Sequence, residues 1–147
     1  MKDIFDISYN QVNIIKSLWE ENRVYHEKIS EYFPQIYMNI DFYKRIKEFS
    51  IFSADEIKIT VAKNNDRYIG YCISSVLKER GEVQSLYVSE SERGSGIGKE
   101  LILRHLEWMK NMKCTVIGVN VSQENQLAIN FYKKLGFFPN TLYMQQQ

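Results

Sequence analysis

The stretch RGSGIGK, residues 93–99, has glycine at every second position, with an arginine before the first glycine and a lysine after the last. A hydrophobic, strand-like run precedes it and a helical pattern follows it. The first N–H groups of a helix have no internal partner and lie at the positive end of the helix dipole. Glycine removes the Cβ atoms that would block close approach. This spacing therefore predicts a phosphate or pyrophosphate site on backbone N–H groups, with Arg93 and Lys99 adding positive charge.

Two common phosphate-binding motifs do not fit these residues. A P-loop needs Ser or Thr directly after its Gly-Lys pair, whereas Glu100 follows Gly98 and Lys99 and offers no hydroxyl for Mg²⁺. A dinucleotide-binding fingerprint needs GxGxxG near the start of a βαβ array. Here the glycines are spaced differently, and the loop lies about two-thirds of the way along the chain. We therefore expect another class of phosphorylated ligand.

Hydrophobic periodicity predicts the elements that would position this loop. We expect a strand over residues 82–88 before the loop and a helix to about Met112 after it. The other expected helices cover residues 10–33, ended by Pro34, then 41–49, and 124–135, closed by Gly136. The other expected strands cover residues 1–7, 56–63, 68–76, 115–121 (as a buried strand) and 137–144. No Pro- or Ser-rich linker divides the chain, which predicts a single α/β domain over residues 1–147.

Composition narrows the class of protein. With 44% hydrophobic and 25% charged residues, the chain is typical of a globular domain. A net charge of +1 gives no reason to expect nucleic acid or an anionic membrane as partner. The sequence shows no signal-peptide core and no run of membrane-spanning length, so we expect a cytoplasmic protein. Cys72 and Cys114 are interpreted as reduced thiols, His26 and His105 as helix residues without a catalytic role, and no ligand spacing suggests a metal.

Three segments, in order, resemble the GNAT superfamily of N-acetyltransferases. Residues 93–98 resemble the family's [QR]xxGx[GA] motif, and the preceding VQSLYV, residues 83–88, is similar to its fourth strand. Residues 125–137, NQLAINFYKKLGF, are similar to the family's N-x-x-A-x-x-F-Y-x-K-x-G-F. The resemblance extends over roughly residues 56–137. It is weak over the first fifty residues, where the family varies with its substrate.

The resemblance implies an α/β (α+β) fold with a central mixed, mostly antiparallel sheet, flanked by helices and splayed between the fourth and fifth strands, residues 82–88 and 115–121. Acetyl-CoA would lie in that gap, its pyrophosphate on the N–H groups of residues 93–99 and its pantetheine paired along residues 86–88. The N–H of Val88 would hold the thioester oxygen. The cofactor-binding residues implied are Leu86, Tyr87, Val88, Arg93, Gly94, Ser95, Gly96, Ile97, Gly98, Lys99, Asn125 and Lys134.

The same resemblance implies two catalytic residues. Tyr132 matches the tyrosine that protonates the departing CoA sulfur. Glu82 matches a glutamate that accepts the amine's proton in histone-type relatives. Another branch carries its glutamate on the fifth strand, where this chain has Asn120, which cannot accept a proton. Proton transfer from the amine to solvent through water, without a dedicated base, therefore stays an alternative.

We accordingly expect an acetyl-CoA-dependent N-acetyltransferase that acylates a primary amine by direct attack and needs no metal. The acceptor would be a small molecule or a peptide, its identity is not predicted, and homodimerisation is left open. The main alternative is a CoA-binding sensor or regulatory module without transferase activity. A domain that binds a different phosphorylated ligand on the same loop is a second alternative.

Overall fold

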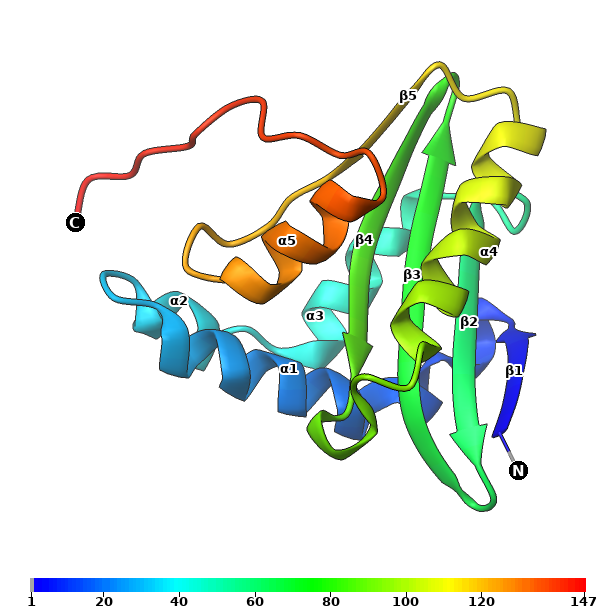
Figure 1. The fold of residues 1–147 in the computed structure, drawn as a ribbon, viewed down its shortest axis with the longest axis horizontal. Helices are drawn as coiled ribbons and strands as arrows, with labels where there is room; N and C mark the ends of the chain where they lie inside the picture. The colour runs from blue at the N-terminus through cyan, green and yellow to red at the C-terminus, as the bar shows by residue number, and fades with distance from the viewer. Residues whose placement is uncertain (1) are drawn as a thin grey trace.

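The computed structural model describes residues 2–147, which build one five-stranded sheet in the order β1-β2-β3-β4-β5 (Figure 1). The strands are β1 Lys2–Ile7, β2 Ile57–Asn64, β3 Arg67–Leu77, β4 Arg80–Val88 and β5 Val116–Val119. Strands β1 to β4 pair antiparallel, and β5 pairs parallel to β4. The expected mixed, mostly antiparallel sheet is confirmed.

The helices differ from expectation mainly in the first third of the chain. They are α1 Lys16–Ile29, α2 Pro34–Met38, α3 Phe42–Lys47, α4 Ile97–Asn111 and α5 Gln126–Lys134, with 3₁₀ turns η1 Tyr9–Ile15, η2 Glu48–Ile51 and η3 Glu90–Glu92. The single helix expected over residues 10–33 is wrong, because its beginning is a 3₁₀ turn and α1 ends at Ile29. Pro34 begins α2 instead of only ending a helix, since proline lacks the N–H that the first helical position leaves unpaired.

The strand expected over residues 137–144 is also wrong, since that segment has no regular secondary structure. Gly136, at φ +92°, ends α5 and lets the chain turn away. The side chain of Gln147 then donates to the carbonyl of Tyr32, on the side of the molecule where α1 ends (Figure 1). Residues 137–144 therefore form no ladder, and β5 is shorter and more exposed than the buried strand expected over residues 115–121.

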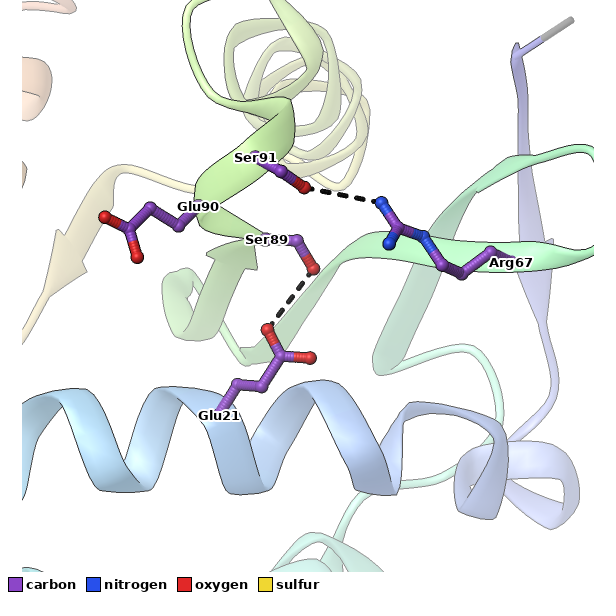
Figure 2. A pocket seen from close by; sticks show the side chains of 5 residues that line it. All are labelled: Glu21, Arg67, Ser89, Glu90 and Ser91. Atoms are coloured by element: carbon purple, nitrogen blue, oxygen red, sulfur yellow. Dashed lines mark hydrogen bonds between the residues drawn. The ribbon is translucent and has the colours of Figure 1, made fainter.

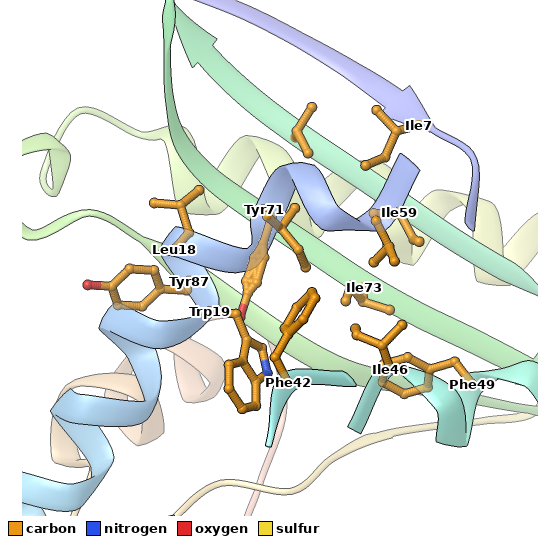
Figure 3. Close-up of a cluster of buried hydrophobic side chains, with 13 residues drawn as sticks. Ile7, Leu18, Trp19, Phe42, Ile46, Phe49, Ile59, Tyr71, Ile73 and Tyr87 are labelled. Atoms are coloured by element: carbon orange, nitrogen blue, oxygen red, sulfur yellow. The ribbon is translucent and has the colours of Figure 1, made fainter. Parts of the chain in front are cut away.

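Helices cover both faces of the sheet and create two hydrophobic clusters. On one face α1 and α3 pack over β2 and β3, where Trp19 meets Phe42 edge-to-face and Tyr71 is fully buried (Figure 3). On the other face α4 and α5 contribute Leu101, Met109 and Tyr132 to a second cluster. Burial of these apolar side chains fixes the loops at the ends of β4 and α5 relative to the sheet.

The sheet opens between β4 and β5. Their ladder joins only Arg80–Val83 to Val116–Val119, so β4 continues to Val88 with no β5 residue beside it. An irregularity in the β3–β4 register coincides with this point, because Ser74 pairs with Val83 but Ile73 pairs with Ser85, leaving Gln84 as an extra residue. Such a bulge increases local twist. The expected splay between the fourth and fifth strands is thus present.

Candidate active site

The glycine loop leads directly into α4. Gly94 and Gly96 have φ angles of +83° and +88°, a region that favours glycine, and Gly96 is the N-cap residue of α4 without any side-chain cap. Within the described chain, the N–H groups of residues 96–99 donate to no acceptor, and the first bond of this helix runs from Glu100 N–H to Gly96 O. A Cβ at Gly94 or Gly96 would meet nothing within 4 Å. The loop therefore combines unpaired donors with open space, which suits an anion.

Two side chains of the loop stabilise its shape. The Ser95 hydroxyl donates to Glu92 O at 2.7 Å. The Arg93 guanidinium turns back toward β4, where its Nε donates to Val88 O at 2.9 Å and its Cζ lies 5.5 and 5.4 Å from the ring centroids of Tyr25 and Tyr87. Arg93 thus ties the loop to the end of β4, while Lys99, on the first turn of α4, is exposed.

The free edge of β4 offers backbone groups to the opening. Ser89 N–H donates to Ile69 O across the β3 side at 2.8 Å. Successive amides in a strand point to opposite edges. The N–H groups of Leu86 and Val88 therefore point to the edge of β4 that has no β5 residue beside it. The side chains of Leu86 and Val88 pack into the cluster under α4, whereas Tyr87 packs under α1.

Tyr132 lies in the cluster under α4 and α5. Only 7% of its surface is exposed, and its ring lies between those of Phe131 and Phe137, at centroid distances of 5.2 and 5.4 Å. Its hydroxyl has no hydrogen-bond partner within residues 2–147, although every fully buried side-chain polar atom there has one. The hydroxyl is therefore not sealed from solvent. Burial, and to a lesser degree the nearby Cys72 thiol, raise the pKa of Tyr132, so it remains protonated at neutral pH.

Glu82 and Asn120 come together where the sheet opens. Asn120 Nδ2 donates to Glu82 Oε1 at 3.1 Å, which links β4 to the first residue after β5. Glu82 is half-buried, on the face of β4 opposite to Val83, whose side chain packs under α4. The carboxylate and the Tyr132 hydroxyl therefore belong to opposite faces of the sheet.

Asn125 and Lys134 lie at the two ends of α5. Asn125 Oδ1 caps the helix by accepting from Ala128 N–H at 3.2 Å, and it also accepts from the Tyr25 hydroxyl at 3.3 Å. Lys134 is exposed on the last turn. A second contact joins the segment after α1 to the segment before α5: Glu31 N–H donates to the Glu124 carboxylate, and this bond lowers the pKa of Glu124.

A pocket of about 410 Å³ lies beside the start of the glycine loop, on the side of α1 (Figure 2). Its lining residues are Glu21, Arg67, Ser89, Glu90 and Ser91. Glu21 accepts from the hydroxyls of Tyr87 at 3.1 Å and Ser89 at 3.3 Å. Burial, followed by the charge of Glu21, raises the pKa of Tyr87 to about 12. With two carboxylates in its wall, this pocket is a poor phosphate site, unlike the uncapped end of α4.

The sequence did not indicate that Glu21 lies at this site. It also did not indicate that Tyr25 contacts Arg93 and Asn125. These contacts join residues that are 66 to 100 positions apart along the chain. Hydrophobic periodicity places such residues on helices and strands but carries no information about their partners.

No helix within residues 2–147 is both long and apolar enough to cross a bilayer. The same residues contain no group of three or more His, Cys, Asp or Glu side chains arranged to hold a metal ion.

Comparison with protein families gives a match to the acetyltransferase (GNAT) family over residues 15–137. An uncharacterised N-acetyltransferase of Methanocaldococcus jannaschii is 34% identical over 90 residues, which cover 56% of this chain and 40% of that protein. N-alpha-acetyltransferase 30 of Schizosaccharomyces pombe is 35% identical over 82 residues, covering 52% of this chain and 55% of that protein. The matched regions thus span about half the length of these curated relatives.

Among solved structures, the aminoglycoside N-acetyltransferase AAC(6')-Iy, in complex with a bisubstrate analogue of CoA and acetylneamine, has a similar fold. The TM-score is 0.67 at 17% sequence identity, and the superposition covers 100% of this chain and 99% of that one. At this identity the similarity concerns the fold alone.

Proposed function

Because this chain belongs to the GNAT family of acetyltransferases, we propose that it transfers the acetyl group of acetyl-CoA to a primary amine. One observation carries the proposal. The uncapped N-terminus of α4, with unpaired N–H groups at residues 96–99, lies next to a strand edge with free amides and no β5 beside it. A pyrophosphate joined to an extended amide-containing arm matches both parts.

The residues present fit acetyl-CoA. The N–H groups of residues 96–99 would hold the pyrophosphate, with Lys99 beside it, because the open space around Gly94 and Gly96 lets phosphate approach the backbone. The pantetheine would hydrogen-bond to the edge of β4 as an added strand. Asn125 and Lys134 would contact the cofactor from α5.

In the proposed reaction, the amine nitrogen attacks the thioester carbon, the carbon–sulfur bond breaks, and the nitrogen loses a proton. Tyr132 would donate its hydroxyl proton to the departing sulfur, since its raised pKa keeps that proton in place until a thiolate forms. Glu82 would accept the amine's proton from the other face of the sheet. Acid and base would thus act from opposite sides on one tetrahedral centre.

Strand geometry favours Leu86 over Val88 as the backbone donor to the thioester oxygen. A strand rises about 3.3 Å per residue, so Glu82 lies roughly 20 Å from Val88 but only about 13 Å from Leu86 along β4. Both N–H groups point to the open edge. The shorter separation still exceeds direct contact, so we propose that water connects the attacking amine to the Glu82 carboxylate.

The acceptor is proposed only as a class. The relatives are named N-alpha-acetyltransferases and aminoglycoside acetyltransferases, both of which act on amines. A small molecule or a peptide with a primary amine fits either comparison.

Calorimetry and turnover test the proposal together. We expect acetyl-CoA to bind the protein, while ATP and NAD do not, and we expect free thiol to be released when a panel of amines and peptide N-termini is supplied. Equal binding of ATP or NAD would contradict the cofactor assignment. Acetyl-CoA binding without thiol release on any acceptor would favour the alternative of a CoA-binding regulatory module.

A further inference from the structure

Glu82 is held by a single side-chain contact, and that contact crosses the opening of the sheet. Its Oε1 accepts from Asn120 Nδ2 at 3.1 Å. Within residues 2–147, Oε2 has no hydrogen bond and the carboxylate has no ion pair within 4 Å. One carboxylate oxygen is therefore oriented by an amide while the other is available.

The backbone explains why Asn120 reaches Glu82. Glu82 is paired with Gly118 in the β4–β5 ladder, which ends at Val83 and Val119. Asn120 lies two residues beyond Gly118, so its side chain is on the same face of β5 as the position opposite Glu82. Because Gly118 has no side chain, nothing on β5 stands between the two polar groups.

The charged groups around this pair leave Glu82 without a competing partner. On the same face, Arg80 Nη2 would lie 3.9 Å from a Cβ at Gly118, and Arg45 of α3 donates to Gln84 and Glu48. Neither arginine forms an ion pair with Glu82 within the described chain. Among the described residues, the amide of Asn120 is therefore the one hydrogen-bond partner of this carboxylate.

We propose that Asn120 is a positioning residue for the Glu82 carboxylate, an inference that rests on the proposed function. The Asn120 amide directs the free Oε2 toward the amine and its connecting water. Asn120 itself takes no proton, because a carboxamide is not a base at neutral pH. Its contribution therefore exists only when Glu82 can accept a proton.

A double-mutant cycle tests this dependence. In the wild-type background, Asn120→Ala should lower kcat/KM about tenfold, a fraction of the roughly 10²-fold or greater contribution of a general base. The KM for acetyl-CoA should stay unchanged. In a Glu82→Gln background, the same Asn120→Ala change should have no further effect on kcat/KM.

A second variant gives a readout that a purely structural role would not produce. Asn120→Asp places a second carboxylate within hydrogen-bond distance of Glu82, and two such groups repel when both are ionised. We expect the acid limb of its pH–rate profile to move to higher pH. Asn111→Ala, which removes an exposed amide at the far end of α4, is the matched control and should retain wild-type kcat/KM.

Each result decides the matter. Additive losses in the cycle, an unchanged kcat/KM for Asn120→Ala, or a pH profile unmoved by Asn120→Asp would each overturn the role of Asn120. Wild-type activity in Glu82→Gln would overturn it too, while leaving the acetyltransferase proposal intact. The proposed function itself is tested separately, by acetyl-CoA binding and by thiol release from the wild-type protein.

Discussion

At the scale of single residues, the site divides its polar groups between the two faces of the sheet. The Tyr132 hydroxyl is nearly enclosed by apolar side chains under α4 and α5, which keeps it neutral. Glu82 is half-buried and bonded to Asn120 on the opposite face. The apolar surroundings of Tyr132 keep its hydroxyl protonated, as the proposed acid role requires, while the half-buried Glu82 carboxylate is accessible to water, as the proposed base role requires.

Tyr132→Phe tests the proposed acid role of Tyr132 with little structural disturbance. The ring contacts with Phe131 and Phe137 stay, and the lost hydroxyl had no hydrogen bond within the described chain. We expect thermal stability and acetyl-CoA affinity to change little, while kcat falls by about ten- to a thousandfold. Calorimetry, thermal unfolding and single-turnover rates check this, and an unchanged chemical rate would assign Tyr132 to packing alone.

At the scale of elements, the strand–loop–helix unit β4, glycine loop and α4 was the most predictable part of the chain. Its glycines have to adopt positive φ or allow close approach, and the apolar repeat of α4 buries against β3 and β4. These are local requirements, so the sequence expresses them directly. The strand boundaries of β2, β3 and β4 followed for the same reason.

The incorrect expectations concern segments whose state depends on distant partners. Residues 137–144 have a strand-like composition, but a strand forms only where another edge accepts it, and Gly136 directs the chain elsewhere. The side-chain placement of Arg93 was equally out of reach. Its bond to Val88 O and its contact with the Tyr25 ring depend on how α1 packs on the sheet.

A matched pair of glycines tests the loop of the candidate site. Gly96 and Gly136 have φ angles of +88° and +92°, and a Cβ at either position would meet nothing within 4 Å. Substitution by alanine at either position should therefore destabilise the fold by a similar amount, about 1 kcal/mol, through backbone strain. Only Gly96→Ala should also weaken acetyl-CoA binding, by roughly ten- to a hundredfold, because its Cβ would occupy the phosphate's approach. Equal affinity in the two variants would remove the pyrophosphate from this loop.

At the scale of the whole molecule, one buried histidine links helix α4 to three adjacent strands of the sheet, β1, β2 and β3. His105 of α4 is fully buried, with Nε2 at 2.8 Å from Thr60 Oγ1 on β2 and Nδ1 at 2.7 Å from Ser74 Oγ on β3. The Thr60 hydroxyl donates to Asp6 on β1 at 2.6 Å, so it accepts from Nε2–H. Burial keeps the imidazole neutral, so Nδ1 carries no proton and accepts from the Ser74 hydroxyl. The expectation that His105 is a helix residue holds, but its polar contacts were not foreseen.

This network predicts that folding weakens in mild acid. Burial, and secondarily the Lys58 charge, lower the pKa of His105 from 6.5 to about 3. Below pH 6.5 the unfolded chain binds a proton at His105 that the folded chain does not, so stability falls as pH falls. At about pH 4.5 the loss from this residue amounts to ~2–3 kcal/mol.

His105→Gln should remove this part of the pH dependence. Glutamine keeps one donor for Thr60 and one acceptor for Ser74 but does not titrate. Urea unfolding at pH 7 and at about pH 4.5 should show a smaller stability loss for the variant than for the wild type.

Titration of Asp6 contributes little to the difference in stability between these two pH values. Burial raises the pKa of its carboxyl, but bonds from Lys58 and Thr60 outweigh that effect and keep it below its ordinary value, under the range tested. If both proteins lost the same stability between the two pH values, His105 would not remain neutral in the fold, and its Nδ1 would donate to the Ser74 hydroxyl instead of accepting from it.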